Sequence, residues 1–381
     1  MGARLVILGE APGREEEALG APFVGASGRF LWEHLAKVGV RRQDVRAENV
    51  LEVRPEGNDL WTIPPHQMAR AQEDCWRRLS KLEGANLIVP VGNLALNTLR
   101  RAPLPIVRSG KRAGKWRLTR TPQGVAIAWR DKIGNWRGSV TRAVFEGGQR
   151  VKVIPTYHPA FILRAGDAWD VWKADLQRVS EDRTFHQLRK WPVARHEVDP
   201  PPPVCQEFLR QVQAAGPEAL LACDIETRPA PGRARIRCVG FALTVDQSII
   251  LDPHRHWKWI VQLLRHPIAK VWCFGLYDRY VLAMSGGLVP QNNLVDVQSL
   301  HHLLDPRDQH RLAYMASREL RVEYWKDEAK EEGGTSGSQK DEFKLRRYCG
   351  KDVTRTLALA GVLLQRVRDQ GLERSTGITT S

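Results

Sequence analysis

Four carboxylates and one tyrosine in the second half of the chain have the types and spacing that phosphodiester hydrolysis requires. Asp224 and Glu226 stand two residues apart, Asp278 lies further along, and Tyr348 precedes Asp352 by four residues. Carboxylate oxygens suit Mg²⁺ and Mn²⁺. Two such ions about 3.5–4 Å apart activate a water and stabilise the leaving oxygen. We therefore predict a two-metal site that holds Mg²⁺ or Mn²⁺ and cuts nucleic acid. The alternative is a set of ordinary surface carboxylates.

Two secondary-structure elements must position these side chains. The apolar run at 220–223 indicates a buried strand that continues into Asp224 and Glu226. Because residues two apart in a strand share a face, both carboxylates reach one metal pair. The spacing of four between Tyr348 and Asp352 places a phenol and a carboxylate on one face of a helix.

A second group of candidate residues follows strand-like runs in the first half of the chain. The run at 4–8 leads into the glycine- and proline-rich stretch 9–13, which contains Glu10, and Phe23 lies in a similar stretch before a helix. His158 follows another strand-like run at 151–154. Glycine and proline allow sharp turns at the carboxyl ends of strands, where α/β proteins place their sites.

Composition favours a polyanionic partner. The chain has 381 residues and a formal net charge of +15, and such a charge attracts nucleic acid. Residues 101–150 include 12 basic and only 2 acidic residues. Basic side chains beside an aromatic one suit phosphate contact and base stacking, whereas the alternative is a solvated basic loop. The predicted DNA contacts are Arg108, Lys111, Arg112, Lys115, Trp116 and Arg117.

The length and a proline run divide the chain into two predicted domains. Because we expect that a proline run cannot enter a helix or a central strand, Asp199 and the four prolines after it predict a stiff linker. We place the domains at 1–183 and 207–375 and the linker at 184–206. The polar stretch 331–340 is expected to be a mobile loop, and the tail after Glu373 to be frayed.

The order of the elements indicates the fold class. In the first domain, strands alternate with helices, which predicts an α/β fold with a mostly parallel sheet. In the second, strands come first and helices are interleaved later, as in a ribonuclease-H-like fold. The expected strands are 4–8, 86–91, 151–154, 220–223, 235–243, 247–251 and 269–274, and the expected helices are 28–38, 65–82 and 342–368.

The cellular setting is indicated only indirectly. We find no run of eighteen apolar residues, and the N-terminus lacks the pattern of a signal peptide. The six cysteines form no CxxC pair, so a disulfide framework or zinc site is not expected. A reducing, cytoplasmic location follows.

The acidic residues resemble a known family. The strings DIET from residue 224, YD at 277–278 and YCGKD at 348–352 are similar to the three motifs of DEDD 3′–5′ exonucleases of the tyrosine subclass. These are the proofreading domains of family A DNA polymerases and their relatives, and the resemblance covers about residues 207–372. It implies that the four carboxylates hold two metals while Tyr348 orients the attacking water. Phe274 departs from the usual asparagine, which puts a substrate-positioning contact in doubt but no metal ligand.

The first domain resembles the uracil-DNA glycosylase superfamily, most closely its family 4. The strings GEAPG at 9–13, PFVG at 22–25 and HPA at 158–160 carry the resemblance, which spans about residues 3–180 and implies an α/β/α sandwich. A glycosylase flips uracil out of the stack and stabilises the charge that develops as the glycosidic bond breaks.

The resemblance implies a role for each of these residues. Phe23 would stack on uracil and the Asn49 amide would contact its O4 and N3–H. His158 would donate to the oxyanion at O2, and Glu10 would hold the water or stabilise the cationic sugar. The predicted uracil-binding residues are Gly9, Ala11, Phe23 and Asn49.

Family 4 enzymes usually carry an iron–sulfur cluster on four cysteines, and this chain departs from that pattern. Nothing corresponds to the first two cysteines, and Val53 stands at the third. Only Cys75 remains, and we expect it to be a buried small hydrophobe. No iron–sulfur cluster is expected.

Two hypotheses for the whole chain follow. The first is a bifunctional DNA enzyme, a uracil-recognising module fused to a metal-dependent 3′–5′ exonuclease, similar to the N-terminal part of some bacteriophage polymerases. Its setting would be viral replication or repair in the host cytoplasm, with a separate DNA polymerase as a partner. In the second, the glycosylase-like domain only holds DNA for the exonuclease, since a fold does not guarantee an activity. The remaining possibility is an inert accessory factor.

Overall fold

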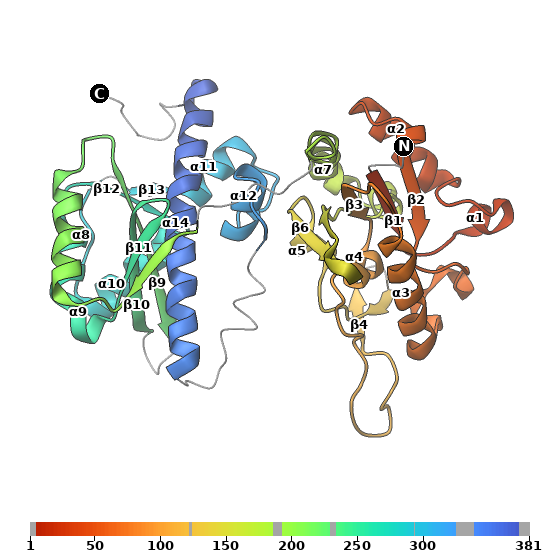
Figure 1. The fold of residues 1–381 in the computed structure, drawn as a ribbon, viewed down its shortest axis with the longest axis horizontal. Coiled ribbons are helices and arrows are strands. Elements are labelled where there is room, and N and C mark those ends of the chain that lie inside the picture. The colour runs from red at the N-terminus through yellow and green to blue at the C-terminus, as the bar shows by residue number, and fades with distance from the viewer. Residues whose placement is uncertain are drawn as a thin grey trace. The chain divides into compact units, whose positions relative to one another are not determined.

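The computed structural model describes residues 5–121, 124–185, 193–228, 234–292, 294–324 and 339–372. The chain forms two compact units, Met1–Leu188 and Arg189–Ser381; both are drawn in Figure 1. The predicted loop at 331–340 lies outside the described residues except for its last two, which begin a helix. The predicted frayed tail also lies outside them.

The first unit is built on a five-stranded sheet in the order β2-β1-β3-β7-β6, in which only β6 is antiparallel to its neighbour. A separate hairpin pairs β4 with β5. The strands are β1 (Leu5–Gly9), β2 (Val45–Asn49), β3 (Leu87–Pro90), β4 (Leu118–Thr121), β5 (Gly124–Ile127), β6 (Thr141–Val144) and β7 (Arg150–Val153).

Helices cover both faces of this sheet. As a result, alternate residues of β1 are buried on opposite sides of it. Leu5 and Ile7 belong to a core with α2 and α7, whereas Val6 and Leu8 belong to a core with α3 and α4. The predicted α/β/α sandwich is confirmed. The helices are α1 (Arg14–Leu19), α2 (Ala26–Lys37), α3 (Pro65–Ser80), α4 (Asn93–Leu99), α5 (Ile133–Trp136), α6 (Pro159–Arg164) and α7 (Trp169–Asp182).

The second unit has a six-stranded sheet in the order β13-β12-β9-β10-β11-β8. Strands β9, β10 and β11 are antiparallel neighbours, while β12 and β13 extend the sheet in parallel with β9. This mixed arrangement is the predicted ribonuclease-H-like fold. The strands are β8 (Arg195–Val198), β9 (Leu220–Arg228), β10 (Arg235–Thr244), β11 (Gln247–Leu251), β12 (Ala269–Trp272) and β13 (Leu294–Asp296).

Two helical layers enclose this second sheet. Apolar residues of α8, α9 and α10 form a core with Leu221 and Cys223 of β9, whereas α11, α12 and α14 form another with Ala222. Figure 1 shows the long helix α14 crossing the sheet. The helices are α8 (Pro202–Ala214), α9 (Pro253–Arg265), α10 (Gly275–Gly286), α11 (Val297–Leu304), α12 (Leu312–Glu319) and α14 (Gln339–Asp369). Among the described residues, no helix has the length and apolar character needed to cross a membrane.

The segment predicted to be a linker, 184–206, contains structured parts of the second unit. Residues 195–198 form β8, which pairs in parallel with β11. Pro201 is the N-cap of α8, and Pro202 and Pro203 form its first turn. Proline is tolerated there because the first helical N–H groups have no partner within the helix. The prediction that the proline run excludes helix was therefore wrong.

Helix α14 lies unusually close to the sheet at Gly240 of β10. A Cβ atom on Gly240 would lie 2.6 Å from Sγ of Cys349 and 3.2 Å from Cγ1 of Val353, both of which are on α14. Only glycine permits this approach. It brings the α14 residues that directly precede these two, Tyr348 and Asp352, against the strand that carries the acidic pair.

Candidate active sites

Parallel strands of the first unit deliver candidate residues to one edge of the sheet. Glu10 follows β1, Asn49 ends β2, and His158 follows β7. Parallel strands end at a common edge, so these side chains meet there. They line one cavity of about 610 Å³, large enough for a flipped base. Other residues of its wall are Ala11, Phe23, Asn93, Ala126, Ile133, Tyr157 and Phe161.

The walls of this cavity are fixed by close contacts around Gly9. A Cβ atom on Gly9 would lie 2.2 Å from Oδ1 of Asn49 and 2.7 Å from Cζ of Phe23. Phe23 itself has a left-handed backbone (φ 56°), which a bulky residue rarely adopts. Its carbonyl accepts a hydrogen bond of 2.8 Å from Nε1 of Trp32. The Phe23 ring is thus held as one wall of the cavity.

His158 is a neutral hydrogen-bond donor in this cavity. Its ring stacks near that of Phe23, with centroids 6.4 Å apart and an interplanar angle of 27°. Burial, and then the charge of Arg164, lower the pKa of His158 to about 4. The backbone N–H of Ala160 donates to Nδ1 over 3.2 Å. Since that nitrogen accepts, the proton of the neutral ring lies on Nε2, the donor that an oxyanion needs.

The carboxylate of Glu10 lies at the N-terminus of helix α4. Its Oε1 accepts a hydrogen bond of 2.8 Å from the backbone N–H of Leu94. Gly92 makes room for it: a Cβ atom there would lie 2.5 Å from the carboxyl carbon of Glu10. Burial raises the pKa of Glu10 to about 7, although hydrogen bonds from the backbone at Leu94 and Asn93 act in the opposite direction. A carboxyl group that changes charge near neutral pH is suited to acid–base work.

The cavity also contains residues that the sequence did not single out. Tyr157 and Asn93 line it, and Oδ1 of Asn93 accepts a hydrogen bond of 2.7 Å from the backbone N–H of Ile133. The sequence contained a signal that could have identified both residues as candidates. Asn93 closely follows the strand β3, and Tyr157 directly precedes His158.

The basic segment leads into the β4–β5 hairpin, and one residue of this hairpin reaches the cavity. Ala126 of β5 lines the cavity. The segment that leads into β4, tan in Figure 1, carries the five predicted basic contacts. All five are exposed: Arg108, Lys111, Arg112, Lys115 and Arg117.

Trp116 was predicted to stack on DNA bases, but the structure buries it. Only 6% of it is exposed, and it packs in the core that contains Trp129. Its Nε1 donates to the carbonyl of Ile63 over 2.7 Å. A large ring that can satisfy its one polar group in the interior is more stable there than on the surface. Trp116 therefore anchors the segment, and its ring is not available to a DNA base.

The second unit assembles three of its four predicted metal ligands into a tight group. Ligand atoms of Asp224, Glu226 and Asp352 all lie within 4.8 Å of one another. The first two come from β9 and the third from α14 (Figure 1). Because hard oxygen donors that crowd in this way repel one another until a cation lies between them, the group fits divalent Mg²⁺ or Mn²⁺.

Asp278 and Tyr348 complete the surroundings of this group. Asp278 stands in the first turn of α10 and is buried. Burial, and then the charges of Glu226 and Asp296, raise its pKa to about 8. Tyr348 is buried and hydrogen-bonded to Asp352, and burial and the nearby carboxylates raise the pKa of its hydroxyl. The phenol is therefore protonated and can donate.

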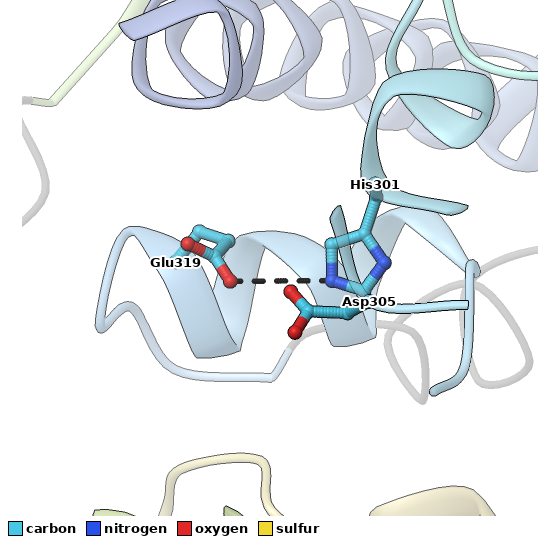
Figure 2. A group of neighbouring side chains, drawn as sticks. All are labelled: His301, Asp305 and Glu319. Carbon is cyan, nitrogen blue, oxygen red and sulfur yellow. Dashed lines mark ion pairs between the residues drawn. The ribbon is translucent and has the colours of Figure 1, made fainter. Parts of the chain in front are cut away.

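A further acidic group on α11 and α12 has a different character. Figure 2 shows His301, Asp305 and Glu319, whose ligand atoms also lie within 4.8 Å of one another. Arg366 donates to Asp305 over 3.0 Å and to Glu319 over 2.9 Å, and Arg318 lies within 4 Å of both carboxylates. Burial lowers the pKa of His301 to about 3. Two arginines already balance the carboxylates, so this group stabilises the fold.

A cavity lined by a neutral histidine and a buried carboxyl group, and a close set of carboxylates, are both arrangements that enzymes hydrolysing nucleic acids use. Comparisons with known proteins agree. Residues 1–177 match the model of the uracil DNA glycosylase superfamily, and residues 205–368 match that of a 3′-5′ exonuclease family. The chain thus belongs to the uracil-DNA glycosylase superfamily through its first unit, which is fused to a 3′–5′ exonuclease domain.

Individual relatives support the assignment of the first unit to this superfamily. The type-4 uracil-DNA glycosylase of Archaeoglobus fulgidus is 31% identical over 180 residues, which are 47% of this chain and 76% of that protein. That of Thermotoga maritima is 32% identical over 161 residues, 42% of this chain and 67% of that protein. Among solved structures, Escherichia coli RNase D is 17% identical, with a TM-score of 0.37 over 48% of each chain. That likeness is weak, and the exonuclease assignment rests on the family match.

Proposed function

We propose that the protein is a bifunctional DNA-processing enzyme that excises uracil in its first unit and removes nucleotides from 3′ ends in its second. The observation that carries the first activity is the neutral His158, whose Nε2–H is available in a cavity shared with Phe23 and Asn49. The second activity is supported by the carboxylate group on β9 and α14.

In the proposed excision, uracil enters the cavity and stacks on Phe23 while the Asn49 amide contacts its edge. As the glycosidic bond breaks, electrons move onto uracil and negative charge develops at O2. The Nε2–H of His158 donates to that oxygen without the loss of its own proton, because its low pKa keeps the ring neutral. Ionised Glu10 stabilises the positive sugar or orients the water that adds to it.

In the proposed exonuclease site, Asp224, Glu226, Asp278 and Asp352 would hold two divalent ions. When bound, these ions activate a water and stabilise the leaving 3′ oxygen. Tyr348 keeps its proton, so its hydroxyl can orient the attacking water. The proposed 3′–5′ polarity is supported by the family match, and we propose single strands or frayed 3′ ends as the substrate.

The proposed substrate is DNA, held partly by the exposed basic segment before β4. A cationic segment joined to a hairpin that lines the cavity suits the phosphates that flank a flipped nucleotide. A separate DNA polymerase is the partner we propose for the exonuclease, since the matching family includes proofreading domains.

A second candidate is that the first unit only holds DNA. The contact between Glu10 and the start of α4 favours it, since a carboxylate in that place also serves as a helix cap.

Variants of the two sites distinguish these candidates. Under the bifunctional proposal, His158→Ala lowers the rate of uracil release by about 10²–10³-fold and leaves Mg²⁺-dependent shortening of DNA unchanged. Asp352→Asn has the reverse effect. If the wild type releases no uracil and His158→Ala binds uracil-containing DNA equally well, the first unit is a holding module.

A further inference from the structure

Helix α10 exposes a continuous apolar face. Leu276, Tyr277, Tyr280 and Met284 are between 43% and 68% exposed. At 100° per residue, these four positions lie within an arc of about 100° on one side of the helix. Contiguous exposed apolar surface of this kind marks a binding site more often than it occurs by chance.

The opposite side of the same helix is fixed within the fold. Val281 and Leu282 pack into the core with α8, α9 and the sheet. Near the end of the helix, a Cβ atom on Gly286 would lie 2.4 Å from the ring of Trp257. The exposed face is therefore carried on a rigid helix, so a ligand that binds it does not have to order the backbone.

The apolar face begins at the exonuclease site. Asp278 projects from the buried side of the first turn. The neighbouring Tyr277 makes a hydrogen bond of 3.0 Å with the hydroxyl of Thr227, the residue after Glu226. Phe274 caps the helix with a left-handed backbone (φ 62°) and is 55% exposed. A strained backbone conformation at an exposed aromatic residue next to a site is a sign of a functional role.

Positive charge lies beside this face. Arg228 and Arg235 are exposed and stand opposite each other at the ends of β9 and β10. Like charges in such a cross-strand pair destabilise a sheet. Among the described residues, neither Arg228 nor Arg235 forms an ion pair. The start of β10 also contacts α10, because the hydroxyl of Ser285 donates to the carbonyl of Ala234 over 2.7 Å.

We propose that the face formed by Tyr280, Met284 and Leu276 is a stacking platform for the unpaired bases that precede the 3′-terminal nucleotide, with Arg228 and Arg235 beside the phosphates. This inference rests on the proposed exonuclease function. From Leu276 to Met284 the helix rises about 12 Å, so more than one base can lie along the face. Aromatic and apolar side chains bind bases of any sequence, which suits an enzyme that removes every nucleotide in turn.

Single-stranded nucleic acid fits this face better than a protein partner does. The face begins beside the carboxylates that act on the 3′ end, and two exposed arginines lie at the ends of the strands next to it. The rings available here are the stacking groups that single-strand binding proteins use.

The test measures steady-state kinetics of the full chain with Mg²⁺ on uracil-free substrates of two lengths. The variant Tyr280→Ala/Met284→Ala is compared with the wild type on a ten-nucleotide single strand and on a dinucleotide. Only the longer substrate reaches the platform. We expect KM for the ten-nucleotide strand to rise at least tenfold, with kcat and dinucleotide cleavage within twofold of the wild type. Tyr280→Phe should restore the wild-type KM, and Val245→Ala, an exposed apolar residue on the β10–β11 turn, is the matched control.

An unchanged KM for the longer strand would overturn the inference, and the face would then serve another partner, such as a protein. If the wild type cleaves neither substrate, the proposed exonuclease function fails. In that event, the platform is tested by measuring how tightly the ten-nucleotide strand, labelled with a fluorophore, binds in EDTA. Weaker binding by the double variant supports the platform, and equal binding overturns it.

Discussion

The α-carbon of Gly9 and the side chain of Asn49 are so close that a methyl group on Gly9 would lie 2.2 Å from Oδ1 of Asn49. The two residues are paired on neighbouring parallel strands, β1 and β2. Because Gly9 has no side chain, the amide of Asn49 can occupy this position.

This contact predicts the effect of Gly9→Ala. The new methyl group displaces Asn49 and Phe23 together, and we expect uracil release to fall by at least 10²-fold, because small misplacements in an active site are costly. Rates of base release under single-turnover conditions check this. Gly166→Ala, where the new Cβ meets no atom within 4 Å, is the matched control. Full activity of Gly9→Ala would show that Asn49 does not need its present position.

The pH dependence of uracil release should follow Glu10. Its pKa is raised to about 7 by burial, so the carboxylate is fully ionised only above that pH. Base release should therefore rise about tenfold per pH unit below 7 and level off near pH 8. The pKa of His158 is lowered to about 4, so its ring stays neutral over this pH range. His158 therefore adds no further change of rate with pH.

The matching variant is Glu10→Gln, which should give a slow and pH-independent rate. A raised carboxyl pKa also means that ionisation destabilises the folded state, and this cost is fully present above pH 7. Glu10→Gln should therefore raise the melting temperature at pH 8 but not at pH 4. A wild-type profile that is flat from pH 5.5 to 8 would argue against a role for the Glu10 carboxylate.

The metal-dependent activity should be lost without damage to the other unit. Replacing Asp224 with Asn removes one ligand of the group on β9, and we expect a loss of at least 10³-fold in Mg²⁺-dependent shortening with unchanged uracil release. Gel analysis of a uracil-free strand measures this. Glu319→Gln serves as the control in the arginine-balanced group of Figure 2: it should lower the melting temperature and retain the response to Mg²⁺.

The basic segment should contribute electrostatic affinity. Converting Arg108, Lys111, Arg112 and Lys115 to alanine should weaken DNA binding and reduce the slope of log K against log salt by roughly 0.7–0.9 for each phosphate that is no longer neutralised. Fluorescence anisotropy at several salt concentrations gives the slope. Arg70→Ala, an exposed position on α3, should leave the slope unchanged, and an equal slope in the fourfold variant would show that the segment does not bind phosphate.

Trp116→Ala should act on stability. Because the ring is buried and hydrogen-bonded to Ile63, its removal should cost about 3–5 kcal/mol in the free energy of unfolding, measured by urea denaturation of the full chain. Trp116→Phe should cost less. A variant that keeps its stability and has a weaker affinity for DNA would restore the stacking role predicted from the sequence.

Much of the fold could be predicted because hydrophobic periodicity reports burial. The strand Gln247–Leu251 was placed correctly, and the helix expected at 342–368 is observed at Gln339–Asp369. Strand β9, predicted from the apolar run 220–223 and the acidic pair that follows it, extends two residues beyond Glu226 to Arg228, since its polar residues pair with β10. Local pattern cannot show such pairing.

The candidate sites show the same limit. The motifs place Glu10, Asn49 and His158 at strand ends, and the structure brings them to one cavity. Trp116 was misjudged because a tryptophan among basic residues gives no sign of which side chains lie above it. Its burial depends on Ile63 and Trp129, which are distant in sequence.

The most direct test of two separate activities uses a 5′-labelled single strand with one internal uracil, incubated with EDTA or with Mg²⁺ and then treated with alkali. Base release needs no metal, whereas two-metal hydrolysis does. The bifunctional account predicts an alkali-labile break at the uracil in EDTA, and progressive shortening from the 3′ end only with Mg²⁺. No alkali-labile site in EDTA, under conditions where Mg²⁺ supports shortening, would contradict it.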